Sequence, residues 1–301
     1  MDGSIRFSPL TCGMLLSLIP LIFPGKCAAQ IFVTNSLSHT RISEYALNGS
    51  PINVNFFAPT DFGAYAPTVE GSSIFVLQQN HIVQLDQNGT KLDPSLITGL
   101  NSPWALANDN GFLYVSENDR IGKYTTAGAT VNASLVTNIE PRGIAASVGF
   151  LYVTEPFGHA VRKYTDSGAT VNASFITGLA YPTGVAVWRN RVFVADVGAD
   201  TIGEYDAATG AAINASLITG LHEPLDVAVS PDGLNLYVTN SALGTVAQYT
   251  TSGSLVNPTL ISGLHQTSNI AVIPEPSAAL LIGGTFCCSI LLARWRRHPE
   301  C

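Results

Sequence analysis

A run of three apolar residues recurs six times along the chain, and each copy reads aliphatic, aromatic, valine, as in Ile31-Phe32-Val33. The copies are separated by 38 to 44 residues and begin at Ile31, Ile74, Leu113, Leu151, Val192 and Leu236. Between them, short apolar or alternating runs are divided by Gly, Asn, Asp and Pro, a pattern typical of short β-strands joined by tight turns. No part of the stretch 30–273 shows sustained helical periodicity. The pattern therefore predicts an all-β repeat protein.

The best-preserved repeat begins at Pro182 and contains four expected strands, at residues 184–187, 191–195, 202–205 and 213–218. Repeats of about 40 residues with four short strands each are typical of β-propeller blades. Radial repetition also leaves few free sheet edges, which would otherwise promote aggregation. Six repeats thus predict a six-bladed β-propeller of four-stranded blades.

The two ends of this region predict how the ring closes. The region begins with a second-type strand at residues 31–34 and finishes with a first-type strand at residues 269–273. We therefore expect the N- and C-terminal strands to share one blade, in which the last strand supplies the innermost position.

The segment that opens the best-preserved repeat resembles the repeats of NHL-type propellers. It reads Pro182-Thr183-Gly184-Val185-Ala186-Val187 and is followed by the aliphatic, aromatic, valine strand. The resemblance covers residues 30–273 and is weakest at 63–69, where the Pro-x-Gly start is lost. WD-type repeats are disfavoured because the chain has no Trp-Asp pair. An NHL-like fold implies an architecture and not a function.

Residues 1–29 have the features of a cleaved signal peptide. An apolar run at 14–23 is followed by Pro24-Gly25, and Cys27-Ala28-Ala29 then places small residues where a secretory cleavage site requires them. The alternative is a buried N-terminal helix. We expect the chain to be exported and to begin at Gln30 after cleavage.

Residues 274–301 predict a sorting tail. An uncharged stretch at 278–293 lies between two short motifs. The Pro-Glu-Pro motif before it is Pro274, Glu275 and Pro276, and the basic cluster after it contains Arg294, Arg296 and Arg297. As a helix, this stretch spans about 24 Å, slightly less than a hydrocarbon core, and flanking Trp and Arg side chains can make up the difference. The three features in this order resemble the PEP-CTERM sorting signal of Gram-negative bacteria.

That resemblance implies transient membrane anchoring by the C-terminal helix and processing by an exosortase-type protease. Delivery to the cell surface or to an exopolysaccharide matrix would follow. The alternative is that the tail remains as a permanent single-pass anchor.

The amino-acid composition limits which kinds of site and partner the stretch 30–273 can have. Hydrophobic residues make up 46% of the chain and charged residues 12%, which suits a folded domain with a sizeable core. All five cysteines fall in the two terminal segments, so the region between them has no disulfide and no thiolate for zinc or nucleophilic chemistry. The formal charge is −7, and the terminal segments are basic on balance, so the body is more acidic still. An acidic body repels phosphate backbones, which excludes nucleic acid as a partner.

Three residues are binding candidates. Ligand sites of propellers normally lie on the face that carries the loops between the second and third strands, and Trp104 and Tyr181 are aromatic residues expected there, as are Phe62 and Phe157. Their rings could stack on sugars, the alternative being ordinary packing between blades. Arg142 lies between the blades of Trp104 and Tyr181. As a cation facing the channel it needs a carboxylate, Glu140 being the nearest in sequence, or an anionic ligand.

These observations favour a non-enzymatic binding or scaffold module whose ligand is a matrix polysaccharide or a surface protein. The alternative is a divalent-metal lactonase or lyase that resembles the regucalcin and gluconolactonase family of six-bladed propellers. That resemblance implies one divalent cation, held by side chains at the starts of the innermost strands.

At those positions only Asp226 and Asn269 offer suitable oxygen atoms, whereas calcium prefers six to eight. A lyase of the streptogramin-cleaving type would need His beside Glu in the channel, and none of these positions is His. We therefore keep Asp226 and Asn269 as binding candidates and assign no catalytic residue, metal ligand or cofactor.

A further motif recurs at one position in three repeats. Asn132, Asn172 and Asn214 each begin an Asn-Ala-Ser triplet. Because the triplet returns at the same place in the blade, it predicts a structural hydrogen bond rather than glycosylation.

Overall fold

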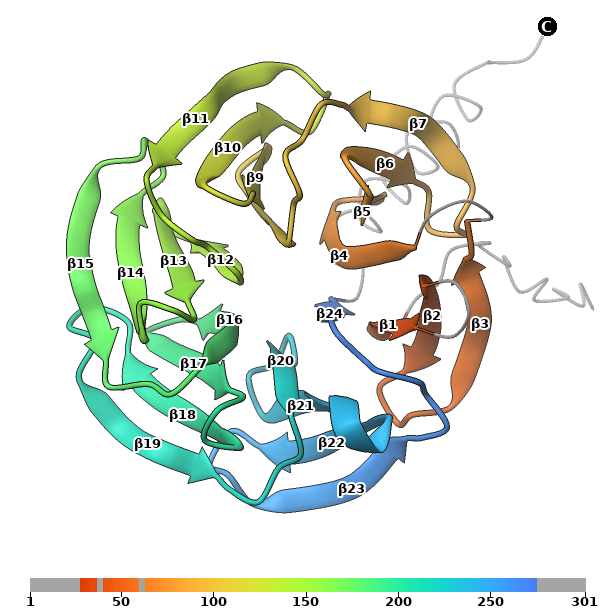
Figure 1. Ribbon diagram of the computed structural model, residues 1–301. Helices are drawn as coiled ribbons and strands as arrows, with labels where there is room; N and C mark the ends of the chain where they lie inside the picture. Colours follow the sequence, from red (N-terminus) through yellow and green to blue (C-terminus); the bar gives the residue numbers. More distant parts are fainter. Residues whose placement is uncertain (1–27, 37–39, 60–62, 275–301) are drawn as a thin grey trace, which may run out of the picture.

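The computed structural model describes residues 28–36, 40–59 and 63–274, which form a ring of six antiparallel sheets (Figure 1). Each sheet is a blade of four strands, with the first strand at the central channel and the fourth at the rim. The only helix in this part of the chain is the single 3₁₀ turn Ser241–Leu243. The predicted six-bladed, all-β propeller is therefore confirmed.

The strands of the first three blades are given from the channel outward. Blade 1 contains β24 (Ile270–Ile273), β1 (Gln30–Ser36), β2 (Thr40–Ala46) and β3 (Pro51–Phe57). Blade 2 contains β4 (Ala64–Glu70), β5 (Ser73–Gln78), β6 (His81–Leu85) and β7 (Lys91–Ile97). Blade 3 contains β8 (Ala105–Asp109), β9 (Phe112–Ser116), β10 (Arg120–Thr125) and β11 (Thr130–Thr137).

The other three blades repeat this order. Blade 4 contains β12 (Ile144–Ser147), β13 (Phe150–Glu155), β14 (Ala160–Thr165) and β15 (Thr170–Thr177). Blade 5 contains β16 (Pro182–Trp188), β17 (Arg191–Asp196), β18 (Thr201–Asp206) and β19 (Ala212–Ile218). Blade 6 contains β20 (Pro224–Val229), β21 (Asn235–Asn240), β22 (Thr245–Thr250) and β23 (Leu255–Ile261).

The ring closes in blade 1, where the last strand of the chain pairs with the first. β24 runs antiparallel to β1, with Gln30 opposite Ile273 and Val33 opposite Ile270. The pairing continues one residue further, because the N–H of Thr34 donates to the carbonyl oxygen of Asn269 at 2.9 Å. The predicted closure by strands from both ends of the region is confirmed.

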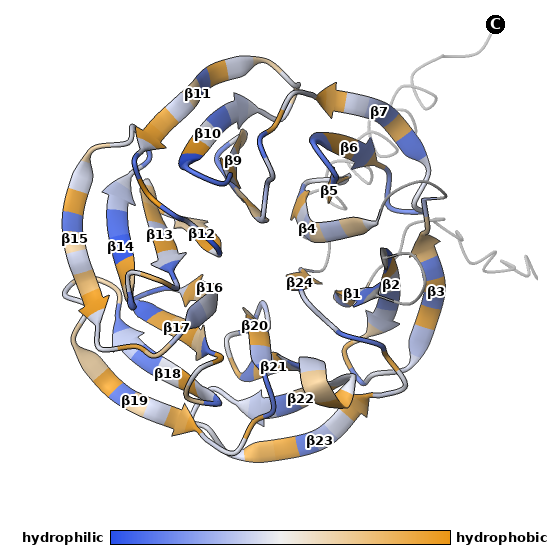
Figure 2. Ribbon diagram, viewed as in Figure 1, coloured by the Kyte–Doolittle hydropathy of each residue, from blue (hydrophilic) through white to orange (hydrophobic). Residues whose placement is uncertain are grey.

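The recurring apolar run forms the second strand of each blade and lies in the core. In all six copies none of the three side chains is more than 3% exposed. These strands are covered by a neighbouring blade on each face, which explains why they read as continuous apolar runs rather than alternating ones. In the outer strands, such as β15 and β23, hydrophobic and hydrophilic residues are mixed (Figure 2), and only residues near the end of each strand are buried because these strands lie at the rim.

The glycine of the Pro-x-Gly start is required by the close approach of neighbouring innermost strands. A Cβ atom on Gly184 in β16 would lie 2.5 Å from Oδ1 and 2.6 Å from Cα of Asp226 in β20. No side chain fits in that space, so only glycine allows the two blades to meet here.

An Asn or Asp in every outer strand forms the same local hydrogen bond. Its Oδ1 atom accepts the backbone N–H two residues later, at 2.8 to 3.2 Å, in Asn53, Asp93, Asn132, Asn172, Asn214 and Asn257. The pairing with the third strand shifts register at the same place in each blade, as at a β-bulge. The structural hydrogen bond predicted for the Asn-Ala-Ser triplets is confirmed.

The predicted terminal segments lie almost wholly outside the described residues. Of the sorting motif the structure describes only Pro274, which is exposed. No helix within the described residues is long and apolar enough to cross a membrane, and the expected membrane helix at 278–293 is not among them. The signal peptide and the sorting tail remain predictions.

Candidate functional site

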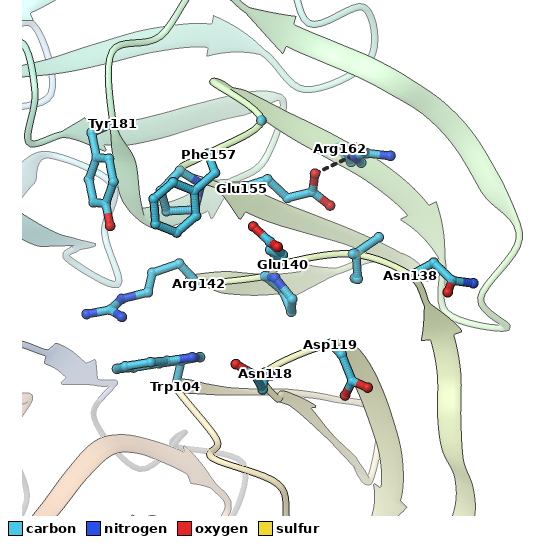
Figure 3. A pocket seen from close by; sticks show the side chains of 14 residues that line it. Trp104, Asn118, Asp119, Asn138, Glu140, Arg142, Glu155, Phe157, Arg162 and Tyr181 are labelled. Atoms are coloured by element: carbon cyan, nitrogen blue, oxygen red, sulfur yellow. Dashed lines mark ion pairs between the residues drawn. The ribbon is translucent and has the colours of Figure 1, made fainter.

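A cavity of about 660 Å³ opens on the face that carries the β9–β10 and β13–β14 loops, which we call the upper face. It lies between blades 3, 4 and 5 (Figure 3). Its walls combine aromatic rings, carboxylates and guanidinium groups. The lining residues are Trp104, Asn118, Asp119, Asn138, Ile139, Glu140, Pro141, Arg142, Glu155, Pro156, Phe157, Gly158, Arg162 and Tyr181. The structure thus brings three of the five binding candidates, Trp104, Arg142 and Tyr181, into one pocket.

The side chain of Arg142 lies flat on the ring of Trp104, with Cζ 3.7 Å from the ring centroid. The backbone holds both residues in place. The N–H of Trp104 donates to the carbonyl of Ser116 at 2.8 Å, and the Oγ of Ser116 donates to the carbonyl of Arg142 at 2.8 Å. Arg142 is therefore carried by blade 4 but fixed by blade 3, next to the ring on which it stacks.

The local ion pair between Arg142 and Glu140, one of the two explanations for this cation, is not found among the described residues. Neither side chain makes an ion pair within the described part of the chain, and Arg142 is instead stabilised by the π face of Trp104. Burial lowers the pKa of Arg142, with Tyr181 acting in the opposite direction. A guanidinium remains cationic in proteins, so the pocket holds a positive charge with unused N–H donors.

A second pair of rings forms the wall next to blade 5. Phe157 and Tyr181 meet edge to face, with centroids 5.7 Å apart and an interplanar angle of 88°. Phe157 is 71% exposed and Trp104 is 41% exposed, so these two rings are not core residues. Exposed rings beside polar groups are suited to stacking on the apolar face of a ligand. Phe62, the fourth aromatic residue expected on this face, lies outside the described residues.

Glu155 at the end of β13 is a pocket residue that the sequence analysis missed. Its Oε2 atom lies 2.7 Å from Nε of Arg162, and its side chain is only 4% exposed. The other oxygen, Oε1, is buried and has no hydrogen-bond partner in the part of the chain that the structure describes. Burial raises the pKa of Glu155, Arg162 lowers it, and the nearby Glu140 raises it. The pocket therefore contains a buried carboxylate with one free acceptor beside a second carboxylate.

Asp226 and Asn269 lie elsewhere, in the central channel, a cavity of about 630 Å³ lined by the innermost strands. The Oδ1 atom of Asp226 accepts the N–H of Val227 at 2.9 Å, and Oδ2 accepts the N–H of Ile270 at 3.1 Å. The side chain of Asn269 also hydrogen-bonds to this carboxylate. Burial raises the pKa of Asp226 to about 7, although these hydrogen bonds act in the opposite direction.

This donor set does not fit a divalent cation. Both oxygens of Asp226 already accept backbone N–H groups, whereas a hard cation requires several free oxygen ligands. No group of three or more His, Cys, Asp or Glu side chains suited to a metal gathers within the described residues. The two channel candidates belong to adjacent blades and are in contact, and they serve the junction between these blades.

Comparison with known proteins supports the fold and leaves the function open. No protein-family model and no curated protein matches the sequence. Among solved structures, a chain of the nidogen/laminin complex has a TM-score of 0.67 at 15% identity, covering 81% of this chain and 98% of its own. A catalytically inactive virginiamycin B lyase from Staphylococcus aureus, with quinupristin, has a TM-score of 0.60 at 16% identity, covering 83% and 94%. A streptogramin B lyase has a TM-score of 0.58 at 18% identity, covering 77% and 83%.

At these identities the likeness shows a shared propeller fold alone. The similar structures include a protein in a binding complex and lyases, so the fold does not choose between binding and catalysis. That choice depends on the side chains of this chain.

Proposed function

We propose that this protein is an exported propeller of NHL-like architecture that binds an acidic matrix polysaccharide through the upper-face pocket. The observation that carries the proposal is the stack of Arg142 on Trp104. It presents a cation that has no carboxylate partner among the described residues, beside exposed aromatic rings. A surface protein is the other class of ligand that the same face could bind.

The chemistry of the stack suits the carboxylate of a uronic acid. A guanidinium binds a carboxylate through two parallel N–H bonds, and stacking on a ring leaves the edges that carry those donors free. Because Arg142 covers one face of Trp104, the rings of Phe157 and Tyr181 are better placed to contact the sugar itself. The pocket would thus bind the carboxylate and the ring face of the same sugar ligand.

The proposed cellular location follows from the two terminal segments. We propose that residues 1–29 direct export and that residues 274–301 act as a PEP-CTERM-type tail. An exosortase-type protease would process this tail after transient membrane anchoring. Release at the surface would place the propeller among secreted polysaccharides. The lactonase or lyase alternative has less support, because the channel residues Asp226 and Asn269 do not form a site for a divalent cation.

The test is retention on the polysaccharide extracted from the host's matrix. Arg142→Ala should reduce the affinity at least about tenfold, since a hydrogen-bonded charge contributes roughly 1.5–3 kcal/mol. Added salt should weaken the same contribution. Trp104→Ala should also weaken binding, because it removes the surface on which Arg142 is held.

The matched control is Arg189→Ala. Arg189 also lies over a tryptophan, Trp188, at 4.3 Å from the ring centroid, but outside the pocket. Equal losses in Arg142→Ala and Arg189→Ala would show that binding is non-specific. Loss of retention with a chelator, or on replacing Asp226 alone, would instead favour a metal site in the channel. Absence of retention under all conditions would favour a protein ligand.

A further inference from the structure

Glu155 departs from the role of the equivalent residues in other blades. At the end of the second strand, four of these residues accept N–H groups from the loop that leads into their own blade. The bonds, at 2.6 to 3.2 Å, run from Asn101 to Glu117, from Ala180 and Tyr181 to Asp196, from His222 to Asn240, and from His265 to Asn35. Glu155 accepts no such bond. The repeat therefore provides four internal controls, and they show that the fold normally uses this position as a loop clamp.

Because Glu155 does not bind this loop, only one of its two carboxylate oxygens has a partner among the described residues. Oε2 is paired with Arg162, while Oε1 is buried without a hydrogen-bond donor. Glu140 lies on the side of this carboxylate away from Arg162 (Figure 3), and the two carboxylates repel each other. Glu140 makes no ion pair within the described residues. A buried acceptor without a donor, beside a second negative charge, is unfavourable unless a cationic donor satisfies both.

We propose that the part of the pocket between Glu155 and Glu140 is a subsite for a protonated amine. This proposal rests on the proposed function and names the ligand more closely. The ligand is a polysaccharide in which an amino sugar lies next to an acidic unit. Arg142 binds the acidic group beside Trp104, and the two glutamates accept the N–H groups of the ammonium further along the pocket.

An ammonium group fits this subsite better than a metal ion or a neutral amide. It offers three N–H donors and no acceptor, so it can bond to both carboxylates at once. A calcium ion would need six to eight oxygens, and within the described residues no third carboxylate, His or Cys joins the two glutamates in a metal-binding group. An N-acetylated amine carries no charge and would leave the repulsion between the carboxylates in place.

The experiment compares two soluble probes on the full-length protein in a mild detergent. Chitosan oligosaccharides carry protonated amines, and chitin oligosaccharides of equal length carry N-acetyl groups on the same backbone. Calorimetric titration should show binding of the first and weak or no binding of the second. Glu140→Gln and Glu155→Gln should each reduce the affinity for chitosan oligosaccharides at least about tenfold, as expected for loss of a charged hydrogen bond. Glu140 is exposed, so its variant tests the subsite even if Glu155→Gln fails to fold.

The matched control is Glu223→Gln, which removes an exposed carboxylate from the upper face outside this pocket. An equal loss of affinity in Glu223→Gln would reduce the effect to general attraction between a cationic sugar and an acidic protein, and would overturn the subsite. Equal binding of both probes, displacement by calcium, or no effect of Glu140→Gln would overturn it as well. If acidic matrix polymer is still retained through Arg142 in any of these cases, the subsite fails and the proposed function stands.

Discussion

At the scale of single residues, the surroundings of Asp226 change its chemistry. Its carboxyl group lies where β20 meets β24, in the wall of the channel, and burial raises its pKa from 3.8 to about 7. Between these two values the folded protein keeps a proton that the unfolded chain releases. The contribution of this group to stability is therefore fully present below about pH 4 and is lost as the pH rises through about 7.

The first prediction follows from this sign. Asp226→Asn should abolish this part of the pH dependence, so that the wild type loses about 1–3 kcal/mol more than the variant between pH 4 and pH 8. The loss is smaller than the full pKa shift implies, because the side chain faces water in the channel. Urea unfolding across this range measures it. Parallel stability curves for the two proteins would contradict the raised pKa.

Some residues of the site are predictable from the sequence and others are not. The sequence predicts Trp104, Arg142 and Tyr181 on one face, because the order of strands in a propeller blade determines which loops share a face. The partner of Arg142 could not be predicted, because its long side chain can reach either Glu140 or Trp104. Only the three-dimensional structure shows that it contacts Trp104. Glu155 cannot be singled out in the sequence, because a polar residue ends the second strand in every blade. Only the hydrogen bonds in the structure distinguish it from residues such as Glu117 and Asp196, which bind a loop.

At the scale of the strand and the sheet, the apolar pattern was sufficient to predict the strands but not their irregularities. Strands covered on both faces read as unbroken apolar runs, so the second strand of each blade was evident. The outer strands are exposed over most of their length, and each also contains a register shift that no hydrophobic pattern reports. The sequence signal for that shift is the recurring Asn or Asp, whose side chain holds the extra residue of the bulge.

The second prediction concerns this bulge in β15. Asn172→Ala removes the acceptor for the N–H of Ser174 and should cost about 0.5–1.5 kcal/mol of unfolding free energy. Asn172→Asp should be nearly neutral, since Asp93 makes the same bond to Ser95 in blade 2. Chemical denaturation of both variants provides the measurement. Equal losses from alanine and aspartate would mean that the side-chain oxygen does not hold the bulge.

At the scale of the whole molecule, the apolar core lies between blades rather than within them. One cluster joins Phe32 of blade 1 to Ile74 and Val76 of blade 2, and another joins Phe193 of blade 5 to Leu236 and Val238 of blade 6. A blade on its own would expose both of these faces. Stability therefore belongs to the closed ring, as expected when each repeat buries its surface against its neighbours.

The last prediction tests that closure. A chain of residues 30–273 lacks the terminal segments but keeps β24, and we expect it to fold as a soluble, strand-rich monomer. A chain ending at Gly263 lacks β24, which leaves one edge of β1 unpaired between Gln30 and Val33 and exposes the apolar residues that Ile270 covers. An unpaired edge promotes association. The shorter chain should therefore melt at a much lower temperature and aggregate, which calorimetry and sedimentation would detect. Equal melting temperatures would show that the ring does not depend on its closing strand, because the two chains differ only in the segment that contains β24.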